Sequence, residues 1–276
     1  MREQRPGSRG HSRLGGVRHG RTLLLGMELT TFGLLIVAGI GTGIIGYLTG
    51  LASLVSYPAL LAAGLSPVTA NVSNTLGLVG IGIGTTARAG RQFRGERGWL
   101  VPQLAVSAVG GLVGAVLLLT GGESTFEAIV PWLIILGSVA LLAQPWLARL
   151  RGEQDNRTVY LVALFLICLY GGYFGAGAGV IYLAVTLIAT SEPFGRAMVL
   201  KSILLGVTNL VAAVAFIVSA LFLGGPVNWL AALALGLGCV VGGWLGPRIQ
   251  EYLPERGLRV FVAMCGFGLA AWLWLR

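Results

Sequence analysis

The chain contains a single lysine, Lys201, which lies in a largely apolar run that extends from residue 197 to 223. An ionised side chain inside a bilayer costs about 2.5–3.5 kcal/mol on insertion scales, so such a residue usually has a function. Between residues 30 and 275, every acidic residue lies in a polar connection or at its edge: Glu96, Glu123, Glu127, Glu153, Asp155, Glu192, Glu251 and Glu255. Because no carboxylate inside the apolar segments would neutralise it, Lys201 is predicted to bind an anionic ligand.

Polar side chains accompany Lys201 and recur at a matching place earlier in the chain. Ser202 is adjacent, and the helical face of Lys201 continues to Thr208 and Asn209 at i+7 and i+8. The earlier set shares one helical face at i, i+3 and i+4: Asn71, Asn74 and Thr75. Together these groups could surround one oxyanion. Two alternatives stay open: Lys201 could extend its ammonium group to the lipid headgroups, and the amides could only join helices by hydrogen bonds.

Composition indicates the class of protein that carries this site. Of the 276 residues, 55% are hydrophobic and 11% are charged, which is too little polar surface for a soluble domain. Apolar stretches of roughly 20 residues match the ~30 Å hydrocarbon core of a bilayer. The predicted fold is all-α, a polytopic transmembrane helical bundle. Its eight apolar segments are 32–63, 69–87, 99–119, 127–148, 158–189, 197–223, 227–247 and 257–275.

The net charge of +9 is concentrated next to the apolar segments. Six arginines lie in residues 1–28, which we expect to form a basic disordered tail, and four lie between residues 88 and 97. This placement is typical of cytoplasmic segments of a multi-pass protein in the bacterial inner membrane. It predicts membrane lipids, and no nucleic acid, as partners. Either Met1 or Met27 could be the true start.

The apolar segments are arranged as two similar halves. Transmembrane repeat 1 is predicted over residues 29–150 and repeat 2 over residues 151–276, and each has one long segment followed by three of ordinary length. The stretch "ANVSNT" in the first half aligns with "AMVLKS" in the second, which places Asn74 opposite Lys201.

The long first segment of each half is interrupted by glycine. The first has 32 residues, and a helix of that length would span roughly 48 Å, more than one crossing needs. The interruptions are "GIGTGIIGYLTG", which ends at Gly50, and "GGYFGAGAG", which contains Gly175 and Gly177. Broken helices at matching places in two halves predict a transporter binding site, because a helix amino terminus favours an anion. The alternative is close helix packing. We prefer packing for two GxxxG pairs, Gly110/Gly114 and Gly238/Gly242.

The stretches "ANVSNTLGLVGIGIGT", "GGYFGAGAGVIYLA" and "LKSILLGVTNLVAAVAFIVSA", the last followed by "GGPVNW", resemble the sulfite exporter TauE/SafE family. The resemblance extends over nearly everything after Met27. It implies a carrier for small sulfur-containing anions, such as sulfite, thiosulfate or organosulfonates, that binds its substrate between two repeats. It also implies that Lys201 and Asn209 line the site from the second half and Asn74 from the first. Ser53 stands where the resemblance implies a denser glycine run.

Other function classes and two topologies stay open. An anion channel or a non-transporting structural protein is the alternative to a carrier, whereas an enzyme is not expected, because the spans lack Asp, Glu and His. No cofactor or metal is expected, and a homo-oligomer is possible. Without an acidic relay, we expect exchange or movement down the substrate gradient. Eight single crossings would give parallel repeats, whereas the basic residues at 88–97 and 248–259 favour inverted repeats.

Overall fold

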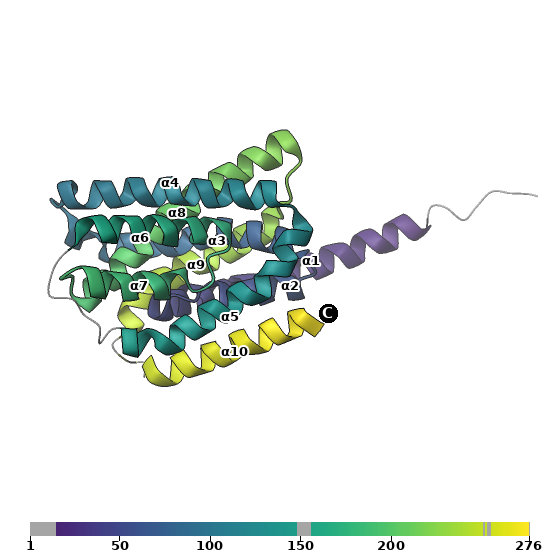
Figure 1. Ribbon diagram of the computed structural model, residues 1–276. Helices are drawn as coiled ribbons and strands as arrows, with labels where there is room; N and C mark the ends of the chain where they lie inside the picture. The colour runs from purple at the N-terminus through teal and green to yellow at the C-terminus, as the bar shows by residue number, and fades with distance from the viewer. Residues whose placement is uncertain (1–14, 148–155, 251, 253–254, 276) are drawn as a thin grey trace, which may run out of the picture.

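The computed structural model describes residues 15–147, 156–250, 252 and 255–275. These residues form helices joined by short connections and contain no β-strand, so the predicted all-α class is confirmed. The helices pack side by side into one bundle (Figure 1). They are α1 (Gly15–Thr49), α2 (Ser53–Ala62), α3 (Pro67–Ala89), the 3-10 helix η1 (Gly90–Phe93), α4 (Arg97–Gly121), α5 (Glu123–Leu147), α6 (Arg157–Tyr173), α7 (Ala178–Ala189), α8 (Phe194–Leu223), α9 (Trp229–Ile249) and α10 (Glu255–Leu275).

Five stretches of helix are long and apolar enough to cross a membrane. They are Leu29–Thr49 of α1, Arg97–Gly121, Glu123–Ala143 of α5, Phe194–Leu223 and Trp229–Ile249. The shorter apolar helices are α2, α6, α7 and the Val262–Leu275 part of α10. The helix α3 has 23 residues but is less apolar, because it contains polar residues such as Asn71 and Asn74, which are buried. The presence of several apolar helices is therefore consistent with a multi-pass membrane protein.

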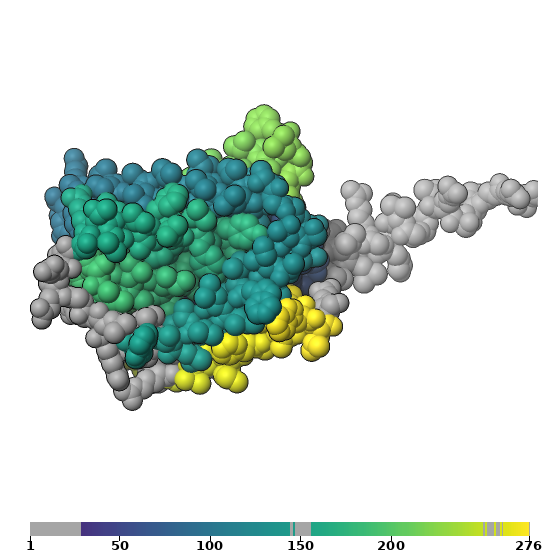
Figure 2. Space-filling model, in the orientation of Figure 1, coloured from purple at the N-terminus to yellow at the C-terminus, as the bar shows by residue number. Residues whose placement is uncertain are grey.

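The outer surface of the bundle is apolar. Large hydrophobic side chains of α4, α5 and α8 are exposed, among them Val101, Trp132 and Leu210. The end of α8, light green in the space-filling view, projects beyond α4 (Figure 2), and Phe222 at this end is 79% exposed. Such a surface is suited to contact with lipid, because the transfer of apolar side chains out of water is favourable.

The two long apolar segments are divided, as predicted. A short turn separates α1 from α2, and another separates α6 from α7. Three glycines in these turns, Gly50, Gly175 and Gly177, have φ angles of 80°, 78° and 85°. Glycine adopts this left-handed conformation without the steric cost that a Cβ atom brings. The glycine interruptions therefore reverse the chain instead of only kinking a helix.

The segment 158–189 does not cross the bundle once. The backbone N–H of Asn156, directly before α6, donates to the carbonyl oxygen of Ala189, the last residue of α7, at 3.3 Å. The beginning of α6 and the end of α7 therefore lie at the same end of the bundle (Figure 1). Of the two topologies left open by the sequence, the one in which this segment crosses once does not describe it, because the left-handed glycines turn α7 back along α6.

The first helix of the first half runs parallel to α9. An added Cβ atom on Gly39 would lie 3.0 Å from the Cα atom of Gly238, and one on Gly43 would lie 2.7 Å from the Cα atom of Gly242. The contacts advance in the same direction on both helices, which is the mark of parallel packing. The absence of side chains at these positions lets the two backbones approach closely.

The first helix of the second half, α6, runs parallel to α4 in the same way. An added Cβ atom on Gly110 would lie 2.8 Å from the Cβ atom of Cys168, and one on Gly114 would lie 2.9 Å from the carbonyl carbon of Gly172. Together with the α9 contacts, these distances confirm that the two GxxxG pairs pack helices. Because α4 and α9 run in opposite directions (Figure 1), α1 and α6 also do so.

One end of the bundle carries the basic connections and is called the basic end below. The side chain of Arg88 stacks over Trp244 of α9 with 5.0 Å from Cζ to the ring centroid. The hydroxyl of Tyr47, near the end of α1, donates to Gln250 after α9 at 3.3 Å. The loop 88–97 and the chain after α9 therefore lie on the same side.

The amino-terminal part of α1 leads to the opposite end (Figure 1). The helix begins at Gly15, within the stretch 1–28 for which the sequence predicts a disordered tail, while residues 1–14 lie outside the described residues. The start of α1 and the loop 88–97 thus lie at opposite ends of the bundle, in contrast to the common cytoplasmic interpretation of the basic segments.

Candidate functional site

A cavity of about 50 Å³ lies where the two broken helices approach α3 and α8. This volume exceeds the space that a single water molecule needs, about 10–15 Å³ by the same measure, and suits a small ion. Its polar lining residues are Ser53, Lys201, Ser202, Thr208 and Asn209. Its glycines are Gly46, Gly50, Gly82, Gly171, Gly175 and Gly206.

The side chain of Lys201 is 1% exposed and points to the end of α1. Its Nζ atom donates to the carbonyl oxygen of Tyr47 at 2.5 Å and to that of Gly46 at 3.3 Å. Carbonyl groups in the last turn of a helix form the negative end of its dipole, and the carbonyl of Gly46 also accepts from the backbone N–H of Gly50 at 2.9 Å. Lys201 therefore caps α1 from inside the bundle, which contradicts the alternative that it extends to the headgroups.

The ammonium group retains binding capacity after this capping. It has three N–H donors, and two are used by the carbonyls of α1. Among the described residues that line the cavity, no other side chain is charged. The cavity therefore offers a cationic donor without a neighbouring carboxylate, which is suited to an anion.

The other polar groups on α8 differ in how far they are committed to the protein. Ser202 donates its hydroxyl to the carbonyl of Met198 at 3.2 Å, and Thr208 donates to that of Leu204 at 3.0 Å. Their hydroxyl oxygens remain acceptors. Asn209 lines the cavity, and its side chain forms no hydrogen bond with the described part of the chain. Its amide is therefore the second free donor of the cavity, after the ammonium group.

The residues of α3 lie behind the cavity wall. Asn74 donates its Nδ2 to the hydroxyl of Ser53 at 3.2 Å, so Ser53 separates it from the cavity. Asn71 donates to the carbonyl oxygen of Tyr173 at 2.9 Å, and Thr75 to that of Asn71 at 3.0 Å. Neither of the last two lines the cavity. In this conformation Asn71 and Asn74 join α3 to the broken helices, Thr75 bonds within α3, and none of the three lines the cavity.

The glycines of the broken helices also divide into two groups. Gly50 and Gly175 line the cavity, whereas Gly177 packs against Gly137 of α5. An added Cβ atom on Gly50 would lie 2.5 Å from the carbonyl carbon of Gly179. The two breaks are thus in direct backbone contact at the wall of the cavity.

The breaks place helix ends of both polarities at the cavity. The amino-terminal residue of α2, Ser53, and that of α7, Ala178, both line it. The first N–H groups of a helix lack intrahelical partners and attract negative charge. The carboxyl end of α1, which has the opposite polarity, is covered by Lys201. The remaining exposed helix ends favour an anion.

Sequence reasoning missed several cavity residues. Ser53 was noted only as a departure from a glycine run, yet it lines the cavity. Gly46 and Gly171 also line it, and each lies four residues before a predicted cavity glycine, Gly50 or Gly175. The repeated four-residue spacing was a usable signal. The crossing of α3 and α8, where Gly82 touches Gly206, had no such signal, because it depends on the packing of distant helices.

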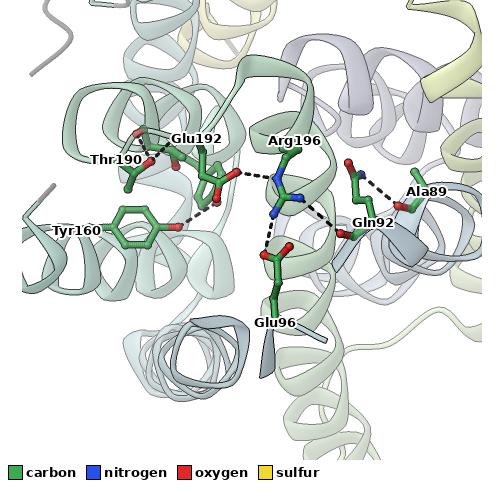
Figure 3. A network of polar contacts seen from close by, with 9 residues as sticks. Ala89, Gln92, Glu96, Tyr160, Thr190, Glu192 and Arg196 are labelled. Carbon is green, nitrogen blue, oxygen red and sulfur yellow. Dashed lines mark hydrogen bonds and ion pairs between the residues drawn. The ribbon is translucent and has the colours of Figure 1, made fainter. Parts of the chain in front are cut away.

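A cluster of charged and polar side chains closes the bundle at the basic end, one to two turns before Lys201 on α8 (Figure 3). Arg196 donates to Glu96 at 2.7 Å and to Glu192 at 2.9 Å, and its Nη1 donates to the carbonyl of Gln92 at 3.4 Å. The guanidinium group also lies over the ring of Phe93, 4.8 Å from its centroid. Arg196 therefore joins the start of α8 to the η1–α4 connection.

Comparison with known proteins agrees with these features. The family model described as "Sulfite exporter TauE/SafE" matches residues 35–273. The "Probable membrane transporter protein YfcA" of Escherichia coli (strain K12) is 28% identical over 245 residues, which cover 87% of this chain and 88% of that protein. The "Probable membrane transporter protein ORF9" of Sinorhizobium sp is 29% identical over 231 residues, 82% of this chain and 84% of that protein. No solved structure matches the chain.

A buried ammonium in a small cavity, apolar outer surfaces and broken helices are features that suit a membrane transporter. The family match covers all the residues that line the cavity. The chain therefore belongs to the sulfite exporter TauE/SafE family of membrane transporters.

Proposed function

We propose that this transporter of the bacterial inner membrane is a carrier for small sulfur-containing anions such as sulfite, thiosulfate or organosulfonates. The observation that carries the proposal is the position of Lys201, whose buried ammonium group borders a cavity without any other charged lining residue. Asn209 and the amino-terminal turns of α2 and α7 provide further donors around the same space. Sulfite fits this set, because its oxygens accept hydrogen bonds and its charge is negative.

Burial of the Lys201 ammonium group raises the affinity of the cavity for an anion. An ammonium group without a counter-charge is costly in a low-dielectric interior, and its cost falls when an anion enters. Neutral carbonyl groups of Gly46 and Tyr47 compensate only part of that cost. A bound anion would therefore be stabilised more strongly here than an isolated ion pair at the surface.

We also propose that the halves 29–150 and 151–276 are inverted repeats. The first helices α1 and α6 run in opposite directions. Helix α1 packs in parallel against α9 of the second half, and α6 packs in parallel against α4 of the first half. This reciprocal packing and the shared position of the two breaks support the proposal. Inverted repeats around a central site are typical of carriers that expose the site to each side in turn.

The decisive experiment measures sulfite flux in proteoliposomes. We expect Lys201→Gln and Lys201→Met to abolish saturable flux, because neither supplies the positive charge. Lys201→Arg should retain only part of it, because the stem of Lys201 is packed tightly: an added Cβ atom on Gly179 would lie 3.1 Å from its Cδ. Loading the vesicles with sulfite should accelerate uptake of labelled sulfite, because a carrier returns faster with substrate bound.

The two neutral variants separate charge from capping. Gln can still donate a hydrogen bond to the end of α1, whereas Met cannot. Wild-type flux in correctly folded Lys201→Gln would overturn the proposed role of the charge. Linear, non-saturable flux without acceleration by internal sulfite would instead indicate an anion channel.

A further inference from the structure

A second hollow lies one helical turn from the central cavity. It has a volume of about 500 Å³ and lies beside α2, the α2–α3 connection, α5 and the end of α10. Gly64, Ser66 and Glu127 of its lining are exposed, so it opens at the surface, at the end of the bundle opposite the basic end. On α2, Ser53 lines the central cavity and Tyr57 lines this hollow. Four residues of helix correspond to about 6 Å.

Aromatic rings fill this short distance. Tyr57 meets Phe174 edge to face with 5.4 Å between ring centroids, and Phe126 lies 5.8 Å from Phe174. Phe174 directly precedes Gly175, which lines the central cavity. The Tyr57 hydroxyl is buried and has no hydrogen-bond partner among the described residues. A buried hydroxyl without a partner is costly, so this hydroxyl is available to a new partner.

The other half carries a tyrosine at the matching place on its short helix. Ala178 of α7 lines the central cavity, and Tyr182 follows four residues later, toward the basic end. The Tyr182 hydroxyl is hydrogen-bonded to that of Tyr160 at 3.0 Å, and Tyr160 donates to Gln103 at 2.6 Å. No residue of this chain of hydrogen bonds is exposed.

Figure 3 shows Tyr160 on the same side as the Arg196 cluster. Both ion pairs found among the described residues belong to it. The basic end is therefore closed by hydrogen bonds and ion pairs that include Tyr182, whereas the opposite end has an open hollow lined by Tyr57, whose hydroxyl has no partner among the described residues. The two ends differ although their short helices carry a tyrosine at the same position.

We propose that Tyr57 and Tyr182 are paired gate residues of the carrier and that the 500 Å³ hollow is the entrance for the anion. In this conformation the gate at Tyr182 is closed, and the rings of Tyr57 and Phe174 are in contact where the entrance approaches the central cavity. In the alternate conformation the Tyr57 hydroxyl gains a partner and the Tyr182–Tyr160 bond opens. This inference rests on the proposed carrier function, because a gate at each end is useful only when access alternates.

The test measures how fast a cysteine in the central cavity reacts from each side. Ser53→Cys is introduced with Cys265→Ser, because Cys265 is exposed whereas Cys168 and Cys239 are buried. A membrane-impermeant anionic methanethiosulfonate is applied to either side of oriented vesicles. We expect faster reaction from the side of the hollow. Tyr182→Phe should raise the rate from the basic end about tenfold, since it deletes one closing hydrogen bond.

The matched variant Tyr57→Phe removes the same hydroxyl at the other gate. It should lower the rate from the basic end, because it weakens the conformation that is closed at the hollow. Tyr160→Phe should act like Tyr182→Phe and provides a second variant if one fails to fold. Equal rates from both ends in all variants, together with saturable flux, would overturn the gates and leave the carrier intact. Asymmetric, variant-dependent labelling without any saturable sulfite flux would instead contradict the proposed substrate and retain the gates.

Discussion

At the residue scale, the two free donors of the cavity have different surroundings. Lys201 is held by two carbonyl groups at the end of α1, so its position is set before a ligand arrives. Asn209 is only partly buried and has no partner in the described part of the chain. Its amide can therefore turn toward an anion without breaking a bond in the protein.

This difference leads to a prediction for the asparagines. Asn209→Ala should raise the KM for sulfite flux roughly tenfold or more, because a hydrogen bond to a charged group contributes about 1.5–3 kcal/mol. Asn71→Ala should leave KM unchanged and lower the free energy of unfolding by about 1–3 kcal/mol, since it strands the carbonyl of Tyr173. Flux kinetics and thermal unfolding of both purified variants check this. A higher KM in Asn71→Ala alone would show that α3 contacts the substrate directly.

At the element scale, the broken helices depend on backbone approach. The turn after α1 meets the first turn of α7 at Gly50 and Gly179, and this contact forms one wall of the cavity. A side chain at Gly50 would meet two obstacles: its φ of 80° and the backbone of α7. Gly64, with a φ of 90°, has the same conformation but no atom within 4 Å of an added Cβ.

Substitution of Gly50 and of Gly64 separates the effect of close approach to α7 from the effect of the left-handed conformation. Gly64→Ala should cost about 1–2 kcal/mol, the strain of a left-handed L-residue. Gly50→Ala should lower the Tm further and reduce sulfite flux, because α7 must move away. Thermal unfolding in detergent and flux in proteoliposomes provide the measurement. Equal losses of stability in both variants would show that the approach of Gly50 to α7 is not important.

At the scale of the whole molecule, the reciprocal packing of the halves determines which loops share a side. The loop 88–97 and the chain after α9 both lie at the basic end, and the start of α5 lies at the other end (Figure 1). The positive-inside rule favours a cytoplasmic basic end. The start of α1, by contrast, lies at the far end.

Labelling of single cysteines checks the arrangement. In the Cys265→Ser background, Arg94→Cys and Arg248→Cys should react with an impermeant maleimide from one side of the membrane. Ser124→Cys, at the start of α5, should react only from the other side. All three positions are exposed. Labelling of Arg94→Cys and Arg248→Cys from opposite sides would contradict inverted repeats.

The sequence by itself determined the helical membrane class and the breaks in both long segments, and it singled out Lys201 as a lone charge in an apolar run. These features are local: apolar length, glycine spacing and an isolated charge can be read along one stretch of chain. The sequence also predicted Gly50, Gly175, Ser202 and Asn209 near the ligand, and they line the cavity with Lys201.

Only the tertiary structure decided what these elements face. That the segment of α6 and α7 turns back is seen in the bond between Asn156 and Ala189, two residues far apart in the chain. The same holds for Asn74, whose donor is occupied by Ser53 of another helix. A helical period shows which residues share a face, but the neighbour on that face is set by packing between distant helices.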